Sequence, residues 1–370
     1  MRPSVGWQLR FLSGLLRGDT AKTPPFTMVV DVTRRCNLNC LHCRLHSPLA
    51  PAPQQDQAAP DFPMDIFLAL CREAKAWGIR KVFFLGEGEP LLHPGLPEMV
   101  AAAKAAGCRV ELLTNGTLLN PHLAHQFITA GLDELRVTLW ASDEEEYRSL
   151  NPGTKPEMFH RTLAGVRTAA ARREKRRSVP WIVLHRPIEP RFFRMLEGTV
   201  DLARKLGCDE VSFSPLKPLL PQDEDRLLKP QEELELAQIL THAGRKAQAA
   251  GLAHNTTEVL QRLRIGRAVW EKLPCYIGWI DVRIRVNGDV VPCDTCHWVM
   301  GNVQREGIRE IWNNPAFREF RRISRRPDGI VASGRHCLCD FCCHAITNAR
   351  LHRLLRWFAP VAAALQKAPS

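Results

Sequence analysis

The sequence predicts an α/β protein with a parallel sheet, followed by a small cysteine-rich α+β domain. Two observations lead to this prediction. Strand and helix patterns alternate from residue 26 to residue 214, and the composition changes near residue 271, after which seven of the thirteen cysteines occur. Strands that alternate with helices pair in parallel through right-handed crossovers, so six such strands form one sheet. A doubly wound sheet and an incomplete (β/α) barrel both fit this pattern.

The elements of the first part follow one another with short connections. Residues 26–33 (FTMVVDVT) are expected to form the first strand, because β-branched and apolar residues dominate them. Each later strand follows a helix, which apolar residues at helical spacing indicate. The expected helix–strand pairs are 64–77 with 81–85, 95–106 with 109–114, 120–130 with 134–139, 157–173 with 180–185, and 191–206 with 209–213.

The second part contains a linker, three helices and a hairpin. Residues 215–235 are rich in Pro, Asp, Glu and Lys and predict a linker. An Asn287-Gly288 pair predicts a tight turn between two short strands. The expected elements are helices 231–250, 257–270 and 307–323, and strands 282–286 and 289–291.

Composition excludes several classes of protein. The 370 residues are 45% hydrophobic and 24% charged, which is typical of a globular protein. No run of 18 apolar residues is present, and the N-terminal segment lacks the pattern of a secretion signal, so we expect a cytoplasmic protein. The net charge of +12 is compatible with nucleic acid, an acidic peptide or an anionic surface. Nucleic acid is not favoured, because no aromatic residues interrupt the densest basic block, residues 172–177.

The cysteines fall into three groups. Cys71, Cys108 and Cys208 occur singly at helix or strand positions, where we expect small buried hydrophobic side chains. Three others lie within eight residues near the N-terminus, and seven lie in the last hundred residues. Clustered cysteines without a secretion signal indicate metal binding rather than a disulfide framework.

The N-terminal group, Cys36, Cys40 and Cys43, has C-x3-C-x2-C spacing directly after the first strand. Three thiolates can hold three irons of a [4Fe–4S] cluster and leave the fourth iron open to another ligand. The alternative is a zinc site completed by His42 or His46.

This motif resembles the signature of the radical S-adenosylmethionine (SAM) enzymes, which lies after the first strand of a (β/α)6 partial TIM barrel. The resemblance implies that His42 lies beside the SAM adenine. A GGEP-like segment after the second strand is the family's second mark, and Gly88-Glu89-Pro90 matches its last three residues. Gly88 is then expected to let the backbone approach the methionine moiety, and Glu89 to accept a hydrogen bond from its ammonium group. Glu87 departs from the family's usual glycine.

Two further strand ends are similar to the family. The third strand ends in Thr114-Asn115-Gly116, and the fourth ends in Thr138-Leu139-Trp140. The resemblance implies that Asn115 contributes to SAM binding and that Thr138 lies near the SAM ribose. In this family the reduced cluster passes an electron to the sulfonium of SAM, and the resulting 5′-deoxyadenosyl radical removes a hydrogen atom from the substrate. The protein's part is to position the reactants and to exclude water.

The C-terminal cysteines resemble a second family pattern. Cys275, twelve residues, Gly288, four residues and Cys293 match the opening of the SPASM and Twitch domains, which bind auxiliary clusters. With the CxxC pair Cys339 and Cys342, this resemblance implies one auxiliary [4Fe–4S] cluster held by four thiolates, the Twitch arrangement. The alternatives are a second auxiliary cluster that uses the remaining cysteines, and a zinc ribbon. Those remaining cysteines are Cys296, Cys337 and Cys343.

These resemblances divide the chain into five segments. We expect a partial barrel, a linker with helices, and an auxiliary-cluster domain between two basic amphipathic ends. The ends are expected to pack against the barrel, with an anionic membrane surface or a partner as the less favoured alternative. The segments are 1–25, 26–214, 215–270, 271–347 and 348–370.

The function implied is a radical SAM oxidoreductase or maturase acting on a peptide or a hydroxylated small molecule. An auxiliary cluster can accept the electron left on the substrate, so net two-electron oxidation is expected, with flavodoxin or ferredoxin as the reductant. The alternatives are a cofactor-biosynthesis enzyme of the same family and a non-catalytic iron–sulfur protein.

Overall fold

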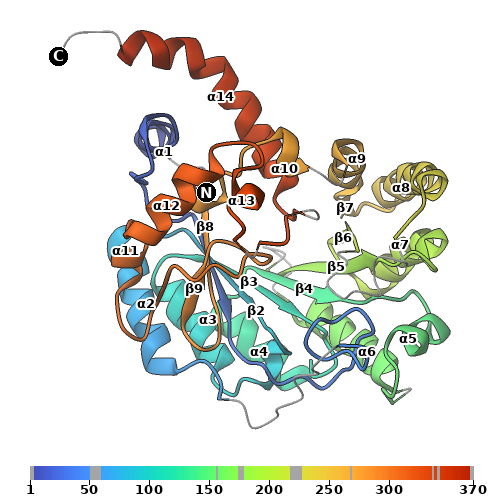
Figure 1. Cartoon of the computed structure of the whole chain (residues 1–370). Helices are drawn as coiled ribbons and strands as arrows, with labels where there is room; N and C mark the ends of the chain where they lie inside the picture. Colours follow the sequence, from blue (N-terminus) through green and yellow to red (C-terminus); the bar gives the residue numbers. More distant parts are fainter. Residues whose placement is uncertain are drawn as a thin grey trace. The chain divides into compact units, whose positions relative to one another are not determined.

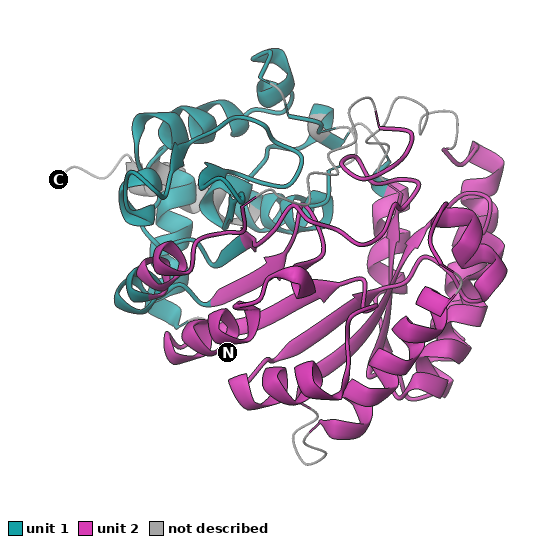
Figure 2. Ribbon diagram, turned by 90° about the horizontal axis from the view of Figure 1, so that it is seen from below, with its two compact units in different colours: residues 1–29, 72–80, 265–370 teal, residues 30–71, 81–264 magenta. Residues whose placement is uncertain are grey.

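The computed structural model describes residues 4–50, 60–155, 157–173, 179–216, 227–266, 269–335, 337–339 and 342–366. Two compact units make up the chain, and Figure 2 colours them separately. Unit 1 comprises Met1–Val29, Arg72–Arg80 and Ile265–Ser370, and unit 2 comprises Val30–Cys71 and Lys81–Arg264. The five expected segment boundaries stay predictions.

Unit 2 contains the parallel sheet that the sequence predicts. From the end of β1 the strand order follows the chain, β1-β2-β3-β4-β5-β6-β7, and β2 through β7 pair in parallel. All six expected strands are present. The short β7 adds a seventh within the 215–270 segment, where only a linker and helices were expected. The strands are β1 Thr27–Asp31, β2 Lys81–Leu85, β3 Arg109–Thr114, β4 Glu134–Thr138, β5 Trp181–Ile188, β6 Glu210–Pro215 and β7 Ala253–His254.

Helices cover one face of these strands (Figure 1). α3, α4, α6, α7 and α8 contact one another in chain order. Beneath them, alternate strand side chains such as Val82, Phe84 and Leu112 are fully buried. The helices of this unit are α3 Leu96–Ala105, α4 Pro121–Ala130, α5 Glu144–Leu150, α6 Glu157–Arg172, α7 Leu196–Leu206, α8 Pro230–Ala249 and α9 Thr256–Ile265, with 3-10 helices η1 Pro90–Leu92 and η2 Phe193–Met195. α2 (Met64–Trp77) begins in unit 2 and ends in unit 1.

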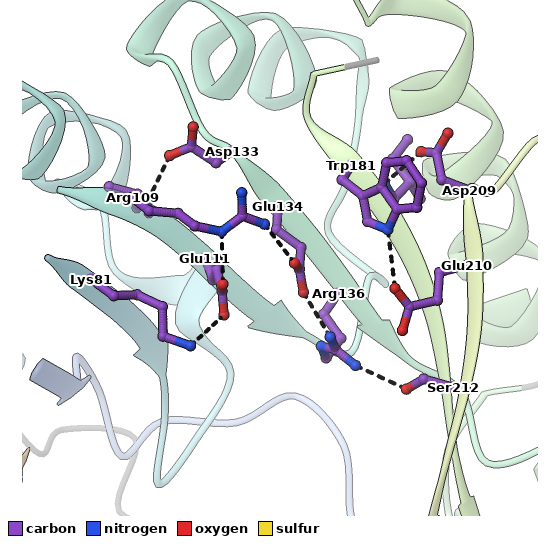
Figure 3. A network of polar contacts seen from close by, with 12 residues as sticks. Lys81, Arg109, Glu111, Asp133, Glu134, Arg136, Trp181, Asp209, Glu210 and Ser212 are labelled. Carbon is purple, nitrogen blue, oxygen red and sulfur yellow. Dashed lines mark hydrogen bonds and ion pairs between the residues drawn. The ribbon is translucent and has the colours of Figure 1, made fainter. Parts of the chain in front are cut away.

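The other face of the strands carries a chain of charged side chains, shown in Figure 3. Lys81 and Arg109 contact the two carboxylate oxygens of Glu111 at 3.1 and 3.0 Å. Arg109 and Arg136 in turn contact Glu134 at 2.9 and 2.7 Å. Opposite charges alternate from β2 to β4, so Glu111 and Glu134 each have two cationic partners.

Unit 1 contains the predicted hairpin. β8 (Asp281–Ile284) and β9 (Asp289–Val291) pair antiparallel on either side of the Asn287-Gly288 turn, and β9 pairs with β10 (Gly301–Asn302). The carbonyl of Ile280 accepts from the backbone N–H of Phe26 at 2.6 Å, at the beginning of β1. The helices of this unit are α1 Val5–Arg17, α10 Val269–Lys272, α11 Ile308–Ile311, α12 Pro315–Ser324, α13 Gly329–Ala332, α14 Ala345–Gln366 and the 3-10 helix η4 Ile277–Trp279.

The expectation of one helix over 307–323 is wrong. Two helices occupy this segment, because Pro315 lacks the N–H that a helix interior requires and instead starts α12. The Asn314 side chain caps α12 by accepting from the N–H of Phe317 at 3.0 Å. Within α12, the fully buried Arg321 donates to the carbonyls of Gly278 and Trp312 at 2.7 and 2.6 Å.

The remaining expectations fall on single residues and on the chain ends. Cys71, Cys108 and Cys208 are buried, as expected. The amphipathic ends form α1 and α14. None of the helices in the described ranges has the length and apolar character needed to cross a membrane. Part of the basic block 172–177 and part of the linker 215–235 lie outside the described residues.

Candidate functional site

The cysteine triad lies on an irregular loop directly after β1. A hydrogen bond from the Cys43 N–H to the Cys40 carbonyl closes the loop at 3.0 Å, and the Leu41 N–H donates to the Leu150 carbonyl at 2.9 Å. Burial, together with the neighbouring Glu89 and Cys43, raises the pKa of Cys36 to about 12. Burial also raises the pKa of Cys40, to which Cys36 and Cys43 add. The structure therefore brings the three sulfurs together.

This donor set fits an iron–sulfur cluster. Buried thiolates close to one another repel, and bound iron supplies the positive charge that stabilises them. Among the described residues, no group of three His, Cys, Asp or Glu side chains is placed around a single metal ion.

The Gly86–Pro90 segment after β2 packs against the start of the cysteine loop. The Gly88 N–H donates to the Thr33 carbonyl at 2.9 Å, and the Glu89 N–H donates to the Arg35 carbonyl at 2.8 Å. A Cβ at Gly88 would overlap the Arg35 carbonyl oxygen. Glycine at this position therefore permits the close approach of two backbone segments. The sequence had predicted a close approach to SAM instead.

Glu87, the departure from the family's usual glycine, has a structural partner. Its carboxylate contacts Arg34 at 2.8 Å, and its carbonyl meets the His46 ring at 3.0 Å. This residue therefore also links the segment after β2 to the cysteine loop, since Arg34 and His46 lie on either side of the cysteine triad.

Glu89 is 2% exposed and accepts three hydrogen bonds. Its Oε1 accepts from the Leu91 N–H at 3.0 Å and from the Thr114 hydroxyl at 2.5 Å, and its Oε2 accepts from the Asn115 N–H at 2.7 Å. Burial raises its pKa above the ordinary value, although these donors oppose the shift. Oε2 has one partner among the described residues, so its second lone pair is compatible with the expected SAM ammonium group.

Asn115, which directly follows β3, was also expected to contribute to SAM binding. Its side chain points to the cysteine loop. Its amide nitrogen donates to Asn37 Oδ1 at 3.0 Å. Its Oδ1 accepts from the Thr117 hydroxyl at 2.7 Å and from the Thr117 N–H at 2.9 Å. Both lone pairs of this oxygen are therefore used within the protein.

His42 lies in a buried pair that sequence reasoning missed. Its Nε2 is 3.4 Å from Glu189 Oε1, and neither side chain is more than 1% exposed. Burial alone would raise the pKa of Glu189, but His42 and Arg191 outweigh it and lower that pKa. The His42 ring also stacks on Trp140 at 5.5 Å between centroids. The sequence offered one indication that Glu189 belongs to the site. It directly follows β5, and barrel enzymes keep their sites at the carboxyl ends of strands.

Thr138 ends β4, in register with His185 of β5. On the same face, His185 contacts the hydroxyl of Ser212 at 2.7 Å and that of Ser214 at 3.2 Å. Arg136 also donates to Ser212, at 2.9 Å, as Figure 3 shows. The carboxyl ends of β4, β5 and β6 therefore present hydroxyl and imidazole groups, where the chain of ion pairs gives way to uncharged polar side chains.

The C-terminal cysteines come together within unit 1. Burial raises the pKa of Cys275 well above its ordinary value, and Cys342, Cys293 and Cys339 all contribute. A cavity of about 30 Å³ is lined by Cys275, Cys339 and Cys342. These four half-buried thiols suit the expected auxiliary cluster, because a [4Fe–4S] cluster takes four thiolates.

The three remaining cysteines are placed differently from one another. Cys296 and Cys337 form a disulfide, which the sequence argument did not expect. Cys343 lies close enough to Cys293 to raise its pKa further, after burial. The residue therefore adjoins the expected ligand set. Asp340 and Phe341, between Cys339 and Cys342, lie outside the described residues.

Two family models match the chain. Residues 30–185 match the radical SAM superfamily, and residues 275–344 match the SPASM iron–sulfur cluster-binding domain. The chain carries both domains. The radical SAM domain implies a [4Fe–4S] cluster with SAM, and the SPASM domain implies auxiliary cluster binding. The triad and the four C-terminal cysteines lie within the two matched segments.

Curated relatives include enzymes that act on different substrates. A PqqA peptide cyclase of Xanthomonas campestris is 26% identical over 82% of this chain and 78% of the relative. An AdoMet-dependent heme synthase of Methanosarcina barkeri is 26% identical over 86% of this chain and 89% of the relative.

Solved structures share the fold. Streptococcus suis SuiB bound to its precursor peptide SuiA has a TM-score of 0.63 at 15% identity, covering 81% of this chain and 67% of SuiB. The anSMEcpe structure with bound AdoMet has a TM-score of 0.63 at 13% identity, covering 92% and 100%. These likenesses agree with the α/β fold class and the partial barrel expected from the sequence.

Proposed function

We propose that this chain is a radical SAM oxidoreductase that modifies a peptide by net two-electron oxidation. The observation that carries the proposal is the triad of Cys36, Cys40 and Cys43 on one loop, within a segment that matches the radical SAM superfamily. The peptide is favoured because relatives and structural neighbours include a peptide cyclase and a protein bound to its precursor peptide.

The chain's residues have separate tasks in this proposal. Cys36, Cys40 and Cys43 hold the cluster, and His42, held by Glu189 and Trp140, offers a fixed ring face to the adenine. Gly88 and Glu89 shape the segment that receives the methionine end of SAM, and Thr138 serves the ribose. When bound, the cluster and SAM supply a 5′-deoxyadenosyl radical.

The auxiliary ligands are proposed to be Cys275, Cys293, Cys339 and Cys342. Four thiolates leave no open iron, so their task is to hold a centre that takes the substrate's surplus electron. An external reductant, flavodoxin or ferredoxin by the same proposal, supplies the electron that starts each turnover.

The test uses anaerobically reconstituted protein with dithionite and SAM. The substrates are synthetic peptides that match short reading frames next to the gene. We expect 5′-deoxyadenosine and a peptide that has lost the mass of two hydrogen atoms. A Cys40→Ala variant is the control and should form neither. Deoxyadenosine formation without any peptide product would retain the radical chemistry and refute the peptide substrate.

A second candidate is an enzyme of cofactor biosynthesis. The heme synthase relative favours it, because its match covers more of both chains than the peptide cyclase match does. Incubation with porphyrin precursors of heme under the same conditions separates the two candidates. Oxidation of a porphyrin side chain, with no change in any peptide, would select this second function.

A further inference from the structure

Asn37, the residue after Cys36, closes a ring of side-chain hydrogen bonds with Thr117 and Asn115. Asn37 Nδ2 donates to Thr117 Oγ1 at 2.8 Å, Thr117 Oγ1 donates to Asn115 Oδ1 at 2.7 Å, and Asn115 Nδ2 donates to Asn37 Oδ1 at 3.0 Å. Each of the three side chains donates one hydrogen bond and accepts another. Such closed chains polarise their members and strengthen one another.

Two members of this ring lie on a rigid turn after β3. Gly116 has a positive φ of 75°, and a Cβ there would lie 2.7 Å from the Val137 side chain. The Thr114 hydroxyl accepts from the Gly116 N–H at 2.9 Å, and the Asn115 N–H donates to Glu89 at 2.7 Å. The turn is therefore held by its own backbone shape and by the buried Glu89.

Asn37 belongs instead to an irregular loop. Residues 32–40 contain no helix or strand, and Cys36 is half-buried. A loop without its own hydrogen-bonded ladder takes its conformation from contacts with neighbouring elements. The ring supplies such a contact one residue away from Cys36.

We propose that Asn115 is a positioning residue, which holds the Cys36 end of the cysteine loop through Asn37 and Thr117 and does not contact SAM. The inference rests on the proposed function, because it concerns the loop that carries the SAM-binding cluster. It replaces the expectation that Asn115 serves SAM directly, since both lone pairs of its side-chain oxygen and one of its amide hydrogens are used within the ring.

The consequence of the ring lies in cluster retention. With the ring intact, the loop holds Cys36 where it can ligate iron. Without the ring, the loop opens more often, and each opening exposes iron to competing chelators. Removing either asparagine breaks the same ring, so the effects of the two substitutions on cluster retention should not add.

The test compares Asn37→Ala, Asn115→Ala and the double variant in reconstituted full-length protein. A chelator, bathophenanthroline disulfonate, is added anaerobically, and retention of the N-terminal cluster is followed by the electron paramagnetic resonance signal that changes when SAM is added. Only a cluster with an open iron responds in this way, so an auxiliary cluster does not interfere. SAM affinity is measured by equilibrium dialysis on the same samples.

We expect both single variants to lose this signal about tenfold faster than wild type, as the loss of one or two hydrogen bonds suggests. The double variant should lose the signal at a rate within about twofold of the faster single variant, because the effects of two residues in one ring do not add. Thr117→Val should behave like the asparagine variants, whereas Thr117→Ser keeps the hydroxyl and should behave like wild type.

The matched control is Asn120→Ala. Asn120, three residues after Thr117, caps α4 by accepting from the N–H groups of His122 and Leu123 at 2.9 and 3.0 Å. It should leave cluster retention unchanged.

Two results would overturn the inference. In the first, Asn115→Ala binds SAM more weakly but retains its cluster as wild type does, and Asn37→Ala matches wild type in both measurements. That result would make Asn115 a SAM contact. The other is unchanged retention in Asn37→Ala and Thr117→Val, a result that stands even where Asn115→Ala does not fold. A wild-type protein without any SAM-responsive signal would instead refute the proposed function itself.

Discussion

Replacing Glu89 by alanine should destabilise the fold as well as weaken SAM binding. The carboxylate accepts from the Leu91 N–H, the Thr114 hydroxyl and the Asn115 N–H, and it is 2% exposed. It therefore joins the segment after β2 to the end of β3. A residue that only contacted a ligand would leave stability unchanged when removed.

The magnitude follows from the three donors that lose their acceptor. A buried donor without a partner costs about 1–3 kcal/mol, so three donors cost roughly 3–9 kcal/mol. Water that enters the vacated space can bond to some of them, and removing a desolvated carboxylate relieves part of its burial cost. We expect a net loss of about 3 kcal/mol for Glu89→Ala, from the low end of that range.

The pKa of Glu89 adds a pH dependence with a defined sign. Burial raises this pKa above its ordinary value of 4.5, so the folded protein binds more protons than the unfolded chain in the interval above 4.5. The contribution of this group to stability is therefore present below that interval and falls as the pH rises through it. Glu89→Gln does not titrate, so the stability difference between wild type and this variant should decline across the interval.

The assay is urea denaturation of reconstituted protein followed by circular dichroism, with SAM affinity measured in parallel. Glu98→Ala is the matched control, because Glu98 is an exposed glutamate in the first turn of α3 and should change stability by no more than about 0.5 kcal/mol. A Glu89→Ala variant as stable as this control, with SAM affinity reduced tenfold or more, would refute the conclusion that Glu89 stabilises the fold by joining the segment after β2 to the end of β3.

Three further predictions concern the clusters and the fold. Cys36→Ala should abolish formation of 5′-deoxyadenosine, measured by chromatography, and wild-type rates in this variant would contradict the assignment of the triad. In Cys339→Ala/Cys342→Ala, iron should fall from about eight to about four per chain while SAM cleavage survives; about twelve irons in the wild type would show a second auxiliary cluster. Glu146→Gln should cost about 3–5 kcal/mol in urea denaturation, because it leaves the fully buried Arg186 without its anionic partner; a cost below about 1 kcal/mol would contradict this.

The sequence was most informative where a local pattern decides the structure. The strands and most of the helices from 26 to 214 were predictable because they are long enough to show their period, and the triad was predictable because its three cysteines are neighbours in the chain. α5 was not expected, since its seven residues (EEEYRSL) show too few apolar positions to indicate a helix. β7 has two residues and no pattern of its own; it forms because β6 offers it a free edge.

The contacts among site residues were harder to predict, because they join segments far apart in the chain. His42 and Glu189 meet only once β1 and β5 are placed in one sheet, and no periodicity reports such a pair. For Gly88 the sequence predicts a contact with SAM, and the structure adds a reason that no motif reports, since a Cβ at this position would overlap the Arg35 backbone. Motif matching finds the position, and the structure supplies the physical cause.

Charge compensation around the cysteine loop bears on the chemistry expected of its cluster. Arg34 and Arg35, which precede Cys36, are each paired with a carboxylate, Glu87 at 2.8 Å and Asp61 at 2.5 Å. These two cations therefore contribute little net positive charge to the loop. The buried Glu89 carboxylate raises the pKa of Cys36, after burial itself, so the local field disfavours added negative charge.

Net charge is one of the quantities that set the reduction potential of an iron–sulfur cluster, and an environment that disfavours negative charge lowers that potential. A low potential is what electron transfer to a sulfonium requires. The polar groups that shape this loop are thus uncharged, as in Asn37, Asn115 and Thr117, or already paired, as in Glu87 with Arg34. They can fix the geometry of the loop without raising the potential of the cluster that it holds.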